Sequence, residues 1–137
     1  MLDKLISLPP GPLPIYEPRT VLVVEDEVLV RTMVAEELRG RGFNIIEAQN
    51  AHEALTLLQS RVPVDLVFSD VQLPGAIDGL ILARLVRKMR PELKIILASG
   101  HLVSGSSLEG ADAFFSKPYD LGRVLTQIEQ LLGGLHR

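Results

Sequence analysis

The chain has 137 residues, 47% hydrophobic and 23% charged, with a net charge of −3 and no cysteine. This length suits one domain with its own core, and the weak charge gives no reason to expect direct binding to nucleic acid or to a membrane surface. Disulfides, thiol nucleophiles and zinc–thiolate sites are excluded, and the apolar runs are too short to span a bilayer. Because residues 1–8 do not resemble a secretory signal, we expect a cytoplasmic location.

Residues 1–18 differ from the rest because five of the nine prolines lie there. Such a segment favours extended backbone and forms neither a helix nor a central strand. We therefore expect a proline-rich N-terminal arm over residues 1–18 and one globular domain over residues 19–137. The arm either lies on the surface or uses its apolar residues to dock a partner.

From Thr20 onward, short apolar runs alternate with amphipathic helical patterns. The central run spans residues 64–70 and ends on a carboxylate, Asp70, between the breakers Pro63 and Pro74. Its uninterrupted apolar part is typical of a buried parallel strand. The runs that we expect to form strands are residues 21–24, 43–47, 64–70, 93–98 and 113–116.

Helical patterns follow four of these strands, and three of them begin with a capping residue: Asn50, Asp78 and Asp120. Residues 101–110 are rich in serine and glycine and predict only a short or irregular fourth helix. The residues expected to face the core are Val30, Met33, Val34 and Leu38, then Ala51, Ala54, Leu55 and Leu58, then Leu82, Leu85, Val86 and Met89, and finally Leu121, Val124, Leu125, Ile128 and Leu132.

This alternation indicates a doubly wound α/β fold with a parallel sheet and helices on both faces. The pattern alone does not determine the strand order. The polar residues that directly follow strands are Glu25, Asp26, Glu27, Asp70, Ser99 and Lys117. Because ligands of open α/β sheets bind at the carboxyl edge, we expect these side chains to share one site.

Clustered carboxylates repel one another unless a cation neutralises them, and Mg²⁺ prefers oxygen ligands. With the metal bound, Asp70 could act as a nucleophile and accept a phosphoryl group. Lys117 and the Ser99 hydroxyl would then balance the added charge. Alternatively, Asp26 only caps the first helix, and Glu27 is a charge favoured by the helix dipole.

Residues 23–27, Ser69–Asp70 with Pro74, residues 98–100 and Lys117–Pro118 occur in the order seen in response-regulator receiver domains (CheY-like). The chain resembles this family over roughly residues 19–133. The resemblance implies a flavodoxin-like fold with a five-stranded parallel sheet in the order 2-1-3-4-5.

The resemblance also implies roles for residues of the site. Asp70 would accept the phosphoryl group from a sensor histidine kinase or a histidine phosphotransfer protein. Glu25, Asp26, Asp70 and the backbone carbonyl of Gln72 would hold Mg²⁺. The protein would be no enzyme beyond Mg²⁺-dependent self-phosphorylation and autodephosphorylation.

By the same resemblance, Ser99 and Phe114 form the switch, Lys117 pairs with the phosphoryl group, and the Lys117–Pro118 bond is cis. The stretch from Ser99 to Phe114 spans 15 positions, fewer than is usual in the family. Phe114 has no hydroxyl, so it could switch only its packing, and a plain core role is the alternative.

Only five residues follow Leu132. If the chain is the whole protein, this predicts a single-domain response regulator that binds a downstream protein partner or passes its phosphoryl group onward. If the chain is a fragment, the output domain was removed. The family also allows a homodimer through the last helix. Two alternatives stay open. One is a phosphorylation-independent pseudo-receiver that serves only as an interaction module. The other is a phosphohydrolase of the haloacid-dehalogenase type, which would need Asp-x-Asp where this chain has Glu25-Asp26-Glu27.

Overall fold

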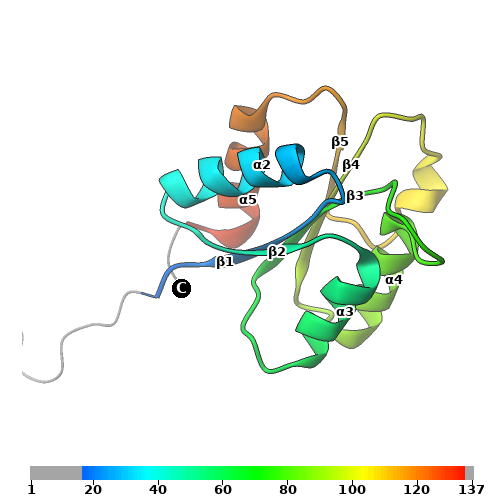
Figure 1. Ribbon diagram of the computed structural model, residues 1–137, viewed down its shortest axis with the longest axis horizontal. Helices are drawn as coiled ribbons and strands as arrows, with labels where there is room; N and C mark the ends of the chain where they lie inside the picture. The colour runs from blue at the N-terminus through cyan, green and yellow to red at the C-terminus, as the bar shows by residue number, and fades with distance from the viewer. Residues whose placement is uncertain (1–16, 135–137) are drawn as a thin grey trace, which may run out of the picture.

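The computed structural model describes residues 17–134 (Figure 1). Apart from Glu17 and Pro18, the expected N-terminal arm lies outside the described residues. The strands are β1 (Thr20–Val24), β2 (Asn44–Ala48), β3 (Leu66–Asp70), β4 (Lys94–Ser99) and β5 (Ala113–Ser116). The helices are α2 (Val28–Gly40), α3 (Ala51–Gln59), α4 (Gly79–Met89) and α5 (Leu121–Leu132), with a 3₁₀ helix, η1 (Gly105–Leu108).

All five strands are parallel and form one sheet in the order β2-β1-β3-β4-β5. In the register, Val23 of β1 lies beside Phe68 of β3, which in turn lies beside Ile96 of β4. The doubly wound fold and the strand order are thus confirmed. All four crossovers bring the chain back to the same edge, so the carboxyl ends of the strands meet there.

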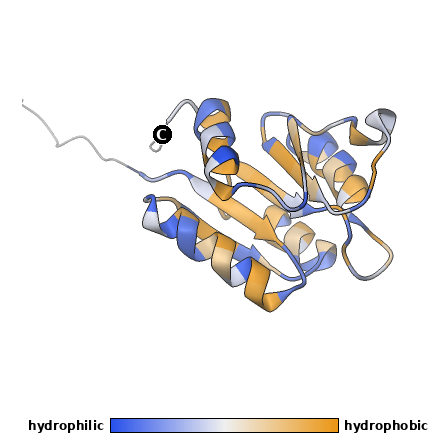
Figure 2. Cartoon of the chain, turned by 90° about the horizontal axis from the view of Figure 1, so that it is seen from above, coloured by the Kyte–Doolittle hydropathy of each residue, from blue (hydrophilic) through white to orange (hydrophobic). Residues whose placement is uncertain are grey.

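The helices form two layers, one on each face of the sheet. Helices α2 and α5 lie on one face, and α3 and α4 lie on the other (Figure 1). Figure 2 shows that the strands are mostly hydrophobic, whereas the helices have hydrophobic and hydrophilic sides. A strand covered on both faces buries every side chain, which explains the continuous apolar runs in the sequence.

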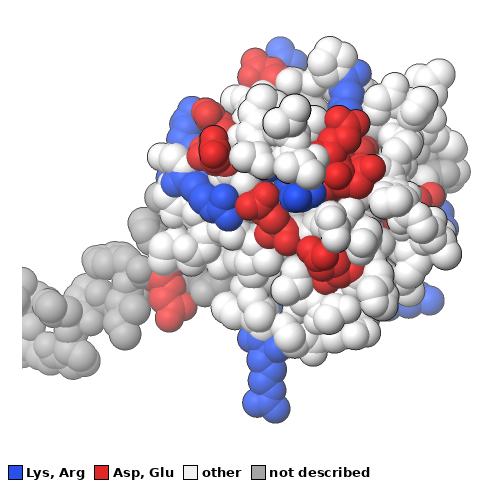
Figure 3. Space-filling view, viewed as in Figure 1, with Lys and Arg blue, Asp and Glu red and all other residues white. Residues whose placement is uncertain are grey.

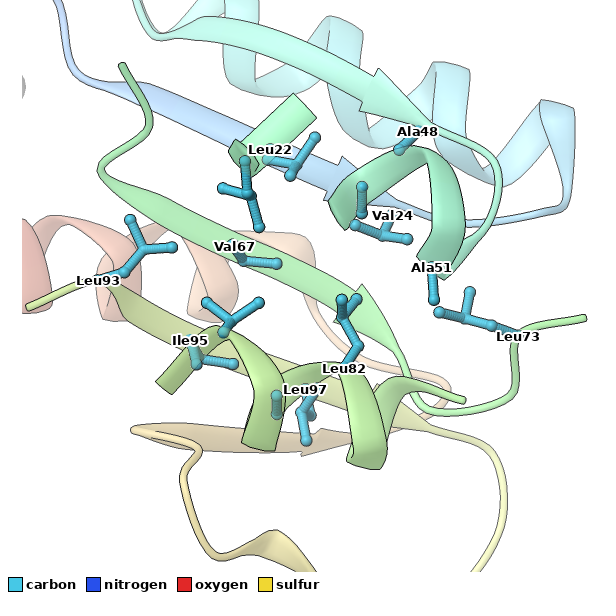
Figure 4. Close-up of a cluster of buried hydrophobic side chains, with 14 of the residues drawn as sticks. Leu22, Val24, Ala48, Ala51, Val67, Leu73, Leu82, Leu93, Ile95 and Leu97 are labelled. Carbon is cyan, nitrogen blue, oxygen red and sulfur yellow. The ribbon is translucent and has the colours of Figure 1, made fainter. Parts of the chain in front are cut away.

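The core on the α3–α4 face is shown in Figure 4. Leu22, Val67 and Ile95 point from the sheet towards Leu82 of α4, and all four side chains are at most 1% exposed. Burying one aliphatic side chain of this size contributes about 1.5–3 kcal/mol to folding. This packing makes the central strands rigid supports for the residues that follow them.

The three predicted helix caps are present. The side chain of Asn50 accepts a hydrogen bond from the Glu53 backbone N–H at 2.7 Å. The side chain of Asp78 accepts a hydrogen bond from the Ile81 backbone N–H at 2.8 Å, and the side chain of Asp120 accepts one from the Gly122 backbone N–H at the start of α5. Each cap satisfies a backbone donor that the helix itself leaves free and so defines where the helix begins.

Three side chains expected in the core are exposed instead: Met33 by 58%, Leu85 by 36% and Met89 by 39%. Helix α2 packs through Val34 and Leu38, so Met33 lies outside the contact. Periodicity identifies the apolar side of a helix, but the neighbouring elements determine how much of that side is covered.

The crossover between β4 and β5 is irregular, as predicted. Its only helical segment is the 3₁₀ helix η1, which has four residues. Arg87 of α4 holds its end. The guanidinium donates hydrogen bonds to the Gly110 carbonyl at 2.8 and 3.1 Å and pairs with Asp112 at 2.7 Å.

Across residues 17–134, no helix combines the length and apolarity that crossing a bilayer requires.

Candidate functional site

Three carboxylates meet at the carboxyl edge of the sheet. Glu25 and Asp26 follow β1, and Asp70 ends β3. Glu25 is 4% exposed, Asp70 is 9% exposed and Asp26 is exposed. One oxygen from each carboxylate lies within 4.8 Å of the other two. The structure therefore brings together three of the four acidic residues that the sequence placed at this edge, and Glu27 lies outside the cluster.

Lys117 provides the cation within this group. Its Nζ lies 3.1 Å from Glu25 Oε1 and 3.2 Å from Asp70 Oδ2. The Lys117 backbone N–H donates to the Ser99 carbonyl at 2.8 Å, which continues the β4–β5 pairing past the strand end. The Lys117–Pro118 bond is cis, as expected. The lysine is thus held by its backbone as well as by its ion pairs.

Glu25 is fixed by contacts that the sequence reasoning missed. Arg31 of α2 donates from Nη1 to the Glu25 carbonyl at 2.7 Å, and its Nε lies 3.4 Å from Glu47 Oε1. The Glu27 backbone N–H donates to Glu25 Oε2 at 3.3 Å. The only signal for Arg31 in the sequence is a cation in the first turn of a helix, which the helix dipole does not favour.

Burial raises the pKa of Glu25 above its usual value of 4.5, and the nearby Asp70 charge adds to this. The hydrogen bond from the Glu27 backbone N–H and the nearby Lys117 ammonium lower the pKa of Glu25, but they do not cancel the increase. For Lys117, burial acts to lower the pKa, but hydrogen bonds to Glu25 and Asp70 raise it overall above 10.5. Lys117 therefore stays charged at neutral pH, and the site holds more negative than positive charge.

The three carboxylates suit a hard divalent cation. Oxygen ligands on opposite sides of Mg²⁺ lie about 4.2 Å apart, so oxygens within 4.8 Å of one another could share one ion after small side-chain movements. Mg²⁺ also keeps several waters, which suits the exposed position of Asp26. The excess of carboxylates over lysine provides the electrostatic reason for binding.

Ser99 ends β4 and is 1% exposed. Its hydroxyl donates to Gln72 Oε1 at 2.9 Å and accepts a hydrogen bond from the His101 backbone N–H at 3.1 Å. The backbone N–H of Gln72 in turn donates to Asp70 Oδ1 at 3.3 Å. Sequence reasoning considered only the Gln72 carbonyl, because no local pattern predicts a side-chain contact between two loops.

Phe114 of β5 is half-buried and packs against the core on the α3–α4 face. Behind the lysine, Tyr119 meets the Phe68 ring edge-on, with centroids 5.7 Å apart, and also approaches Phe115. Burial raises the pKa of Tyr119 above 10.0, so its hydroxyl stays protonated at neutral pH. The sequence reasoning did not single out Tyr119.

Asp26 does not cap the first helix. The N-cap residue of α2 is Glu27, and no side-chain cap hydrogen bond forms there. Asp26 instead shares the acidic cluster with Glu25 and Asp70. Figure 3 shows acidic and basic side chains interspersed on the displayed face, without a large area of one sign.

The fold and the site together define a class: a flavodoxin-like α/β domain with an acidic pocket at the carboxyl edge of its sheet. The model of the response regulator receiver domain family matches residues 21–129. The chain therefore belongs to this family. Receiver domains are signalling modules of two-component systems, and this chain is one of them.

Similar proteins agree with this assignment. The chain is 37% identical over 118 residues to the sensor kinase CckA of Brucella abortus, an alignment covering 82% of this chain and 12% of the kinase. The response regulator TrrA of Thermotoga maritima, crystallised with Mg²⁺-BeF, has 34% identity and a TM-score of 0.77 and covers 83% of this chain and 99% of its own. The NtrX receiver domain of Brucella abortus has 36% identity and a TM-score of 0.73, covering 82% and 98%.

The curated relatives are longer proteins. The chain spans 12% of CckA and 24% of an NtrX-like regulator from Rickettsia felis and of NtrC from Salmonella typhimurium. What is common to these proteins and this chain is the receiver domain.

Proposed function

We propose that Asp70 accepts a phosphoryl group from the phosphohistidine of a sensor kinase or a histidine phosphotransfer protein. A carboxylate oxygen of Asp70 attacks phosphorus, an O–P bond forms, the N–P bond breaks, and the histidine leaves with the bonding electrons. The observation that carries this proposal is the placement of Asp70, a 9% exposed carboxylate at the end of a buried strand, 3.2 Å from the Lys117 ammonium.

Glu25, Asp26, Asp70 and the backbone carbonyl of Gln72 would hold Mg²⁺. When bound, the ion would neutralise negative charge on the carboxylates and on the phosphoryl oxygens. Support comes from the 4.8 Å carboxylate cluster and from TrrA, which was crystallised with Mg²⁺-BeF. Lys117 orients Asp70 and faces the incoming phosphoryl group, so the chain itself supplies one positive charge.

Phosphorylation replaces the −1 carboxylate of Asp70 with a group that carries about −1.5 to −2 charge. We infer that Ser99 and Lys117 bond the phosphoryl oxygens and that Phe114 shifts its packing in response, because its half-buried ring packs against the same core cluster as Val103 and Leu108 of the irregular crossover. A downstream protein would read this change. Replacing Phe114 with leucine should leave phosphoryl uptake intact and reduce the chemical-shift changes that phosphorylation causes in residues 101–112.

We infer that the phosphodonor protein approaches Asp70 across the start of α2, which begins two residues after Asp26. Exposed apolar side chains lie there, with Leu29 84% exposed and Val28 61% exposed. We expect Leu29→Glu to slow phosphoryl transfer from a phosphorylated histidine phosphotransfer domain but not from acetyl phosphate. Leu102→Glu, at a fully exposed leucine on the β4–η1 loop, is the matched control and should affect neither.

The direct test is the intact mass of the protein after incubation with Mg²⁺ and acetyl phosphate. We expect one phosphoryl adduct that requires Mg²⁺, is absent in Asp70→Asn and decays by slow self-hydrolysis. No adduct and no Mg²⁺ binding would favour the phosphorylation-independent interaction module. Many turnovers of a generic phosphate ester would instead indicate a hydrolase.

The homodimer through α5 stays a prediction, and sedimentation velocity with and without phosphodonor tests it.

A further inference from the structure

The hydroxyl of Ser99 is occupied in a way that bears on switching. It donates its proton to Gln72 Oε1 at 2.9 Å and accepts from the His101 backbone N–H at 3.1 Å. A serine hydroxyl has a single proton. While that proton is donated to Gln72, Ser99 cannot donate to a phosphoryl oxygen on Asp70.

Gln72 is placed to connect two parts of the site. It lies on the loop after β3, whereas Ser99 ends β4, so their contact joins two loops at the edge of the sheet. The Gln72 backbone N–H donates to Asp70 Oδ1 at 3.3 Å. One residue therefore contacts the proposed phosphoacceptor through its main chain and Ser99 through its side chain.

Because Ser99 is buried, its hydroxyl depends on protein partners for its hydrogen bonds. The residue is 1% exposed, so water does not readily replace a lost partner. The proton must move from one acceptor to another, and the two available acceptors differ in strength. A hydrogen bond to a charged oxygen is about twice as strong as one to a neutral amide.

We propose that the Gln72 side chain is a latch that holds the Ser99 hydroxyl away from Asp70 until a phosphoryl oxygen takes over its proton. The inference rests on the proposed phosphoacceptor role of Asp70 and deepens it by naming what opposes the switch. Gln72 is a positioning residue, because its side chain acts through Ser99.

A first experiment needs no phosphodonor. NMR coupling constants report the side-chain rotamer of Ser99 in the metal-free, unphosphorylated domain. In Gln72→Met, which keeps the length of the side chain but removes the acceptor, Ser99 should become rotationally averaged. Gln72→Glu keeps an acceptor of the same reach and should retain the wild-type rotamer. An unchanged Ser99 rotamer in Gln72→Met would overturn the latch.

A second experiment measures the affinity for trifluoroberyllate, a phosphoryl mimic, in the presence of Mg²⁺. Gln72→Met should bind it about 3- to 10-fold more tightly than wild type, the range expected from removing one competing hydrogen bond. In a Ser99→Ala background the same substitution should have no effect. Gln59→Met, an exposed glutamine at the end of α3, is the matched control and should match wild type.

The outcomes separate the two proposals. If wild type binds trifluoroberyllate and Gln72→Met binds it equally well, the latch is wrong and the proposed function stands. An equal gain in the Ser99→Ala background would mean that Gln72 acts on Asp70 or the metal directly, which also overturns the latch. If wild type binds no trifluoroberyllate at all, both proposals fail.

Discussion

The two edges of the sheet differ in how their carboxylates are paired with cations. At the amino edge, carboxylates have partners nearby: Asp65 accepts the Thr20 backbone N–H at 2.7 Å and lies 3.9 Å from Arg19, and Arg90 lies 3.3 Å from Glu92. At the carboxyl edge, Lys117 pairs with both Glu25 and Asp70, and Asp26 adds a third carboxylate to the cluster. Carboxylates and cations are matched at the amino edge, whereas carboxylates exceed cations in the cluster at the carboxyl edge.

The contacts at the amino edge serve the fold, whereas the excess of carboxylates at the carboxyl edge serves the proposed function. Ion pairs at the surface contribute little, and the Asp65 contact mainly fixes where β1 and β3 begin. Glu25 and Asp70 are nearly buried and leave negative charge uncompensated, which costs folding energy. The larger cost lies at the edge where the domain is proposed to bind Mg²⁺ and react, which is the usual location of such strain.

The sharpest test of this contrast exchanges one carboxylate at each edge. Asp70→Asn should abolish phosphoryl uptake from acetyl phosphate, because the amide is not a nucleophile for this reaction. Asp65→Asn should leave uptake at the wild-type level. Intact mass spectrometry of both variants decides the matter, and an adduct on Asp70→Asn would move the acceptor to another residue.

The second largest effect should come from the cations. Lys117→Met should slow phosphoryl uptake by about a hundredfold or more, since it removes a charged donor facing the reacting group. It should also tighten Mg²⁺ binding, because the metal no longer competes with an ammonium 3.1 Å from Glu25. Arg90→Met at the amino edge should change neither quantity. Weaker Mg²⁺ binding in Lys117→Met, measured by calorimetry, would contradict the unbalanced-charge account.

A third prediction concerns pH. The folded-state pKa of Glu25 lies above 4.5, so Glu25 gains a proton as the pH falls through that raised value. A protonated carboxyl is a poor metal ligand, and Mg²⁺ affinity should therefore begin to fall at a pH above 4.5. In Glu25→Gln the residual Mg²⁺ binding should lose this step. A wild-type profile with no step above 4.5 would contradict this prediction.

The smallest effect should appear at the amino edge. Asp65→Asn should lower the free energy of unfolding by about 1 kcal/mol, because the amide accepts the Thr20 N–H less strongly than a carboxylate does. Urea denaturation measures this change. Glu92→Gln, which alters an exposed ion pair, should give no measurable shift in the midpoint. A larger effect for Glu92 than for Asp65 would reverse the assignment of roles at this edge.

Much of this was predictable because it is local. The strands and the caps at Asn50, Asp78 and Asp120 follow from patterns within a few residues. The convergence of Glu25 with Asp70 follows from the rule that parallel strands share their carboxyl edge. The strand order came from the family resemblance, since alternation alone permits several orders.

What could not be predicted depends on neighbours distant in sequence. Met33 and Leu85 have the spacing of core residues, yet no element within residues 17–134 covers them. The bond between Gln72 and Ser99 depends on the shape of two loops, and no residue pattern encodes it. Arg87 gives the same lesson, because its partners at residues 110 and 112 lie more than twenty positions away.

The Arg87 contacts have a practical consequence. Because this side chain fixes the Gly110 end of the β4–β5 crossover to α4, that end is held in place without contributing to the sheet. The fully exposed Leu102, near the other end of the crossover, therefore offers an attachment point for a small label that leaves the strands in place.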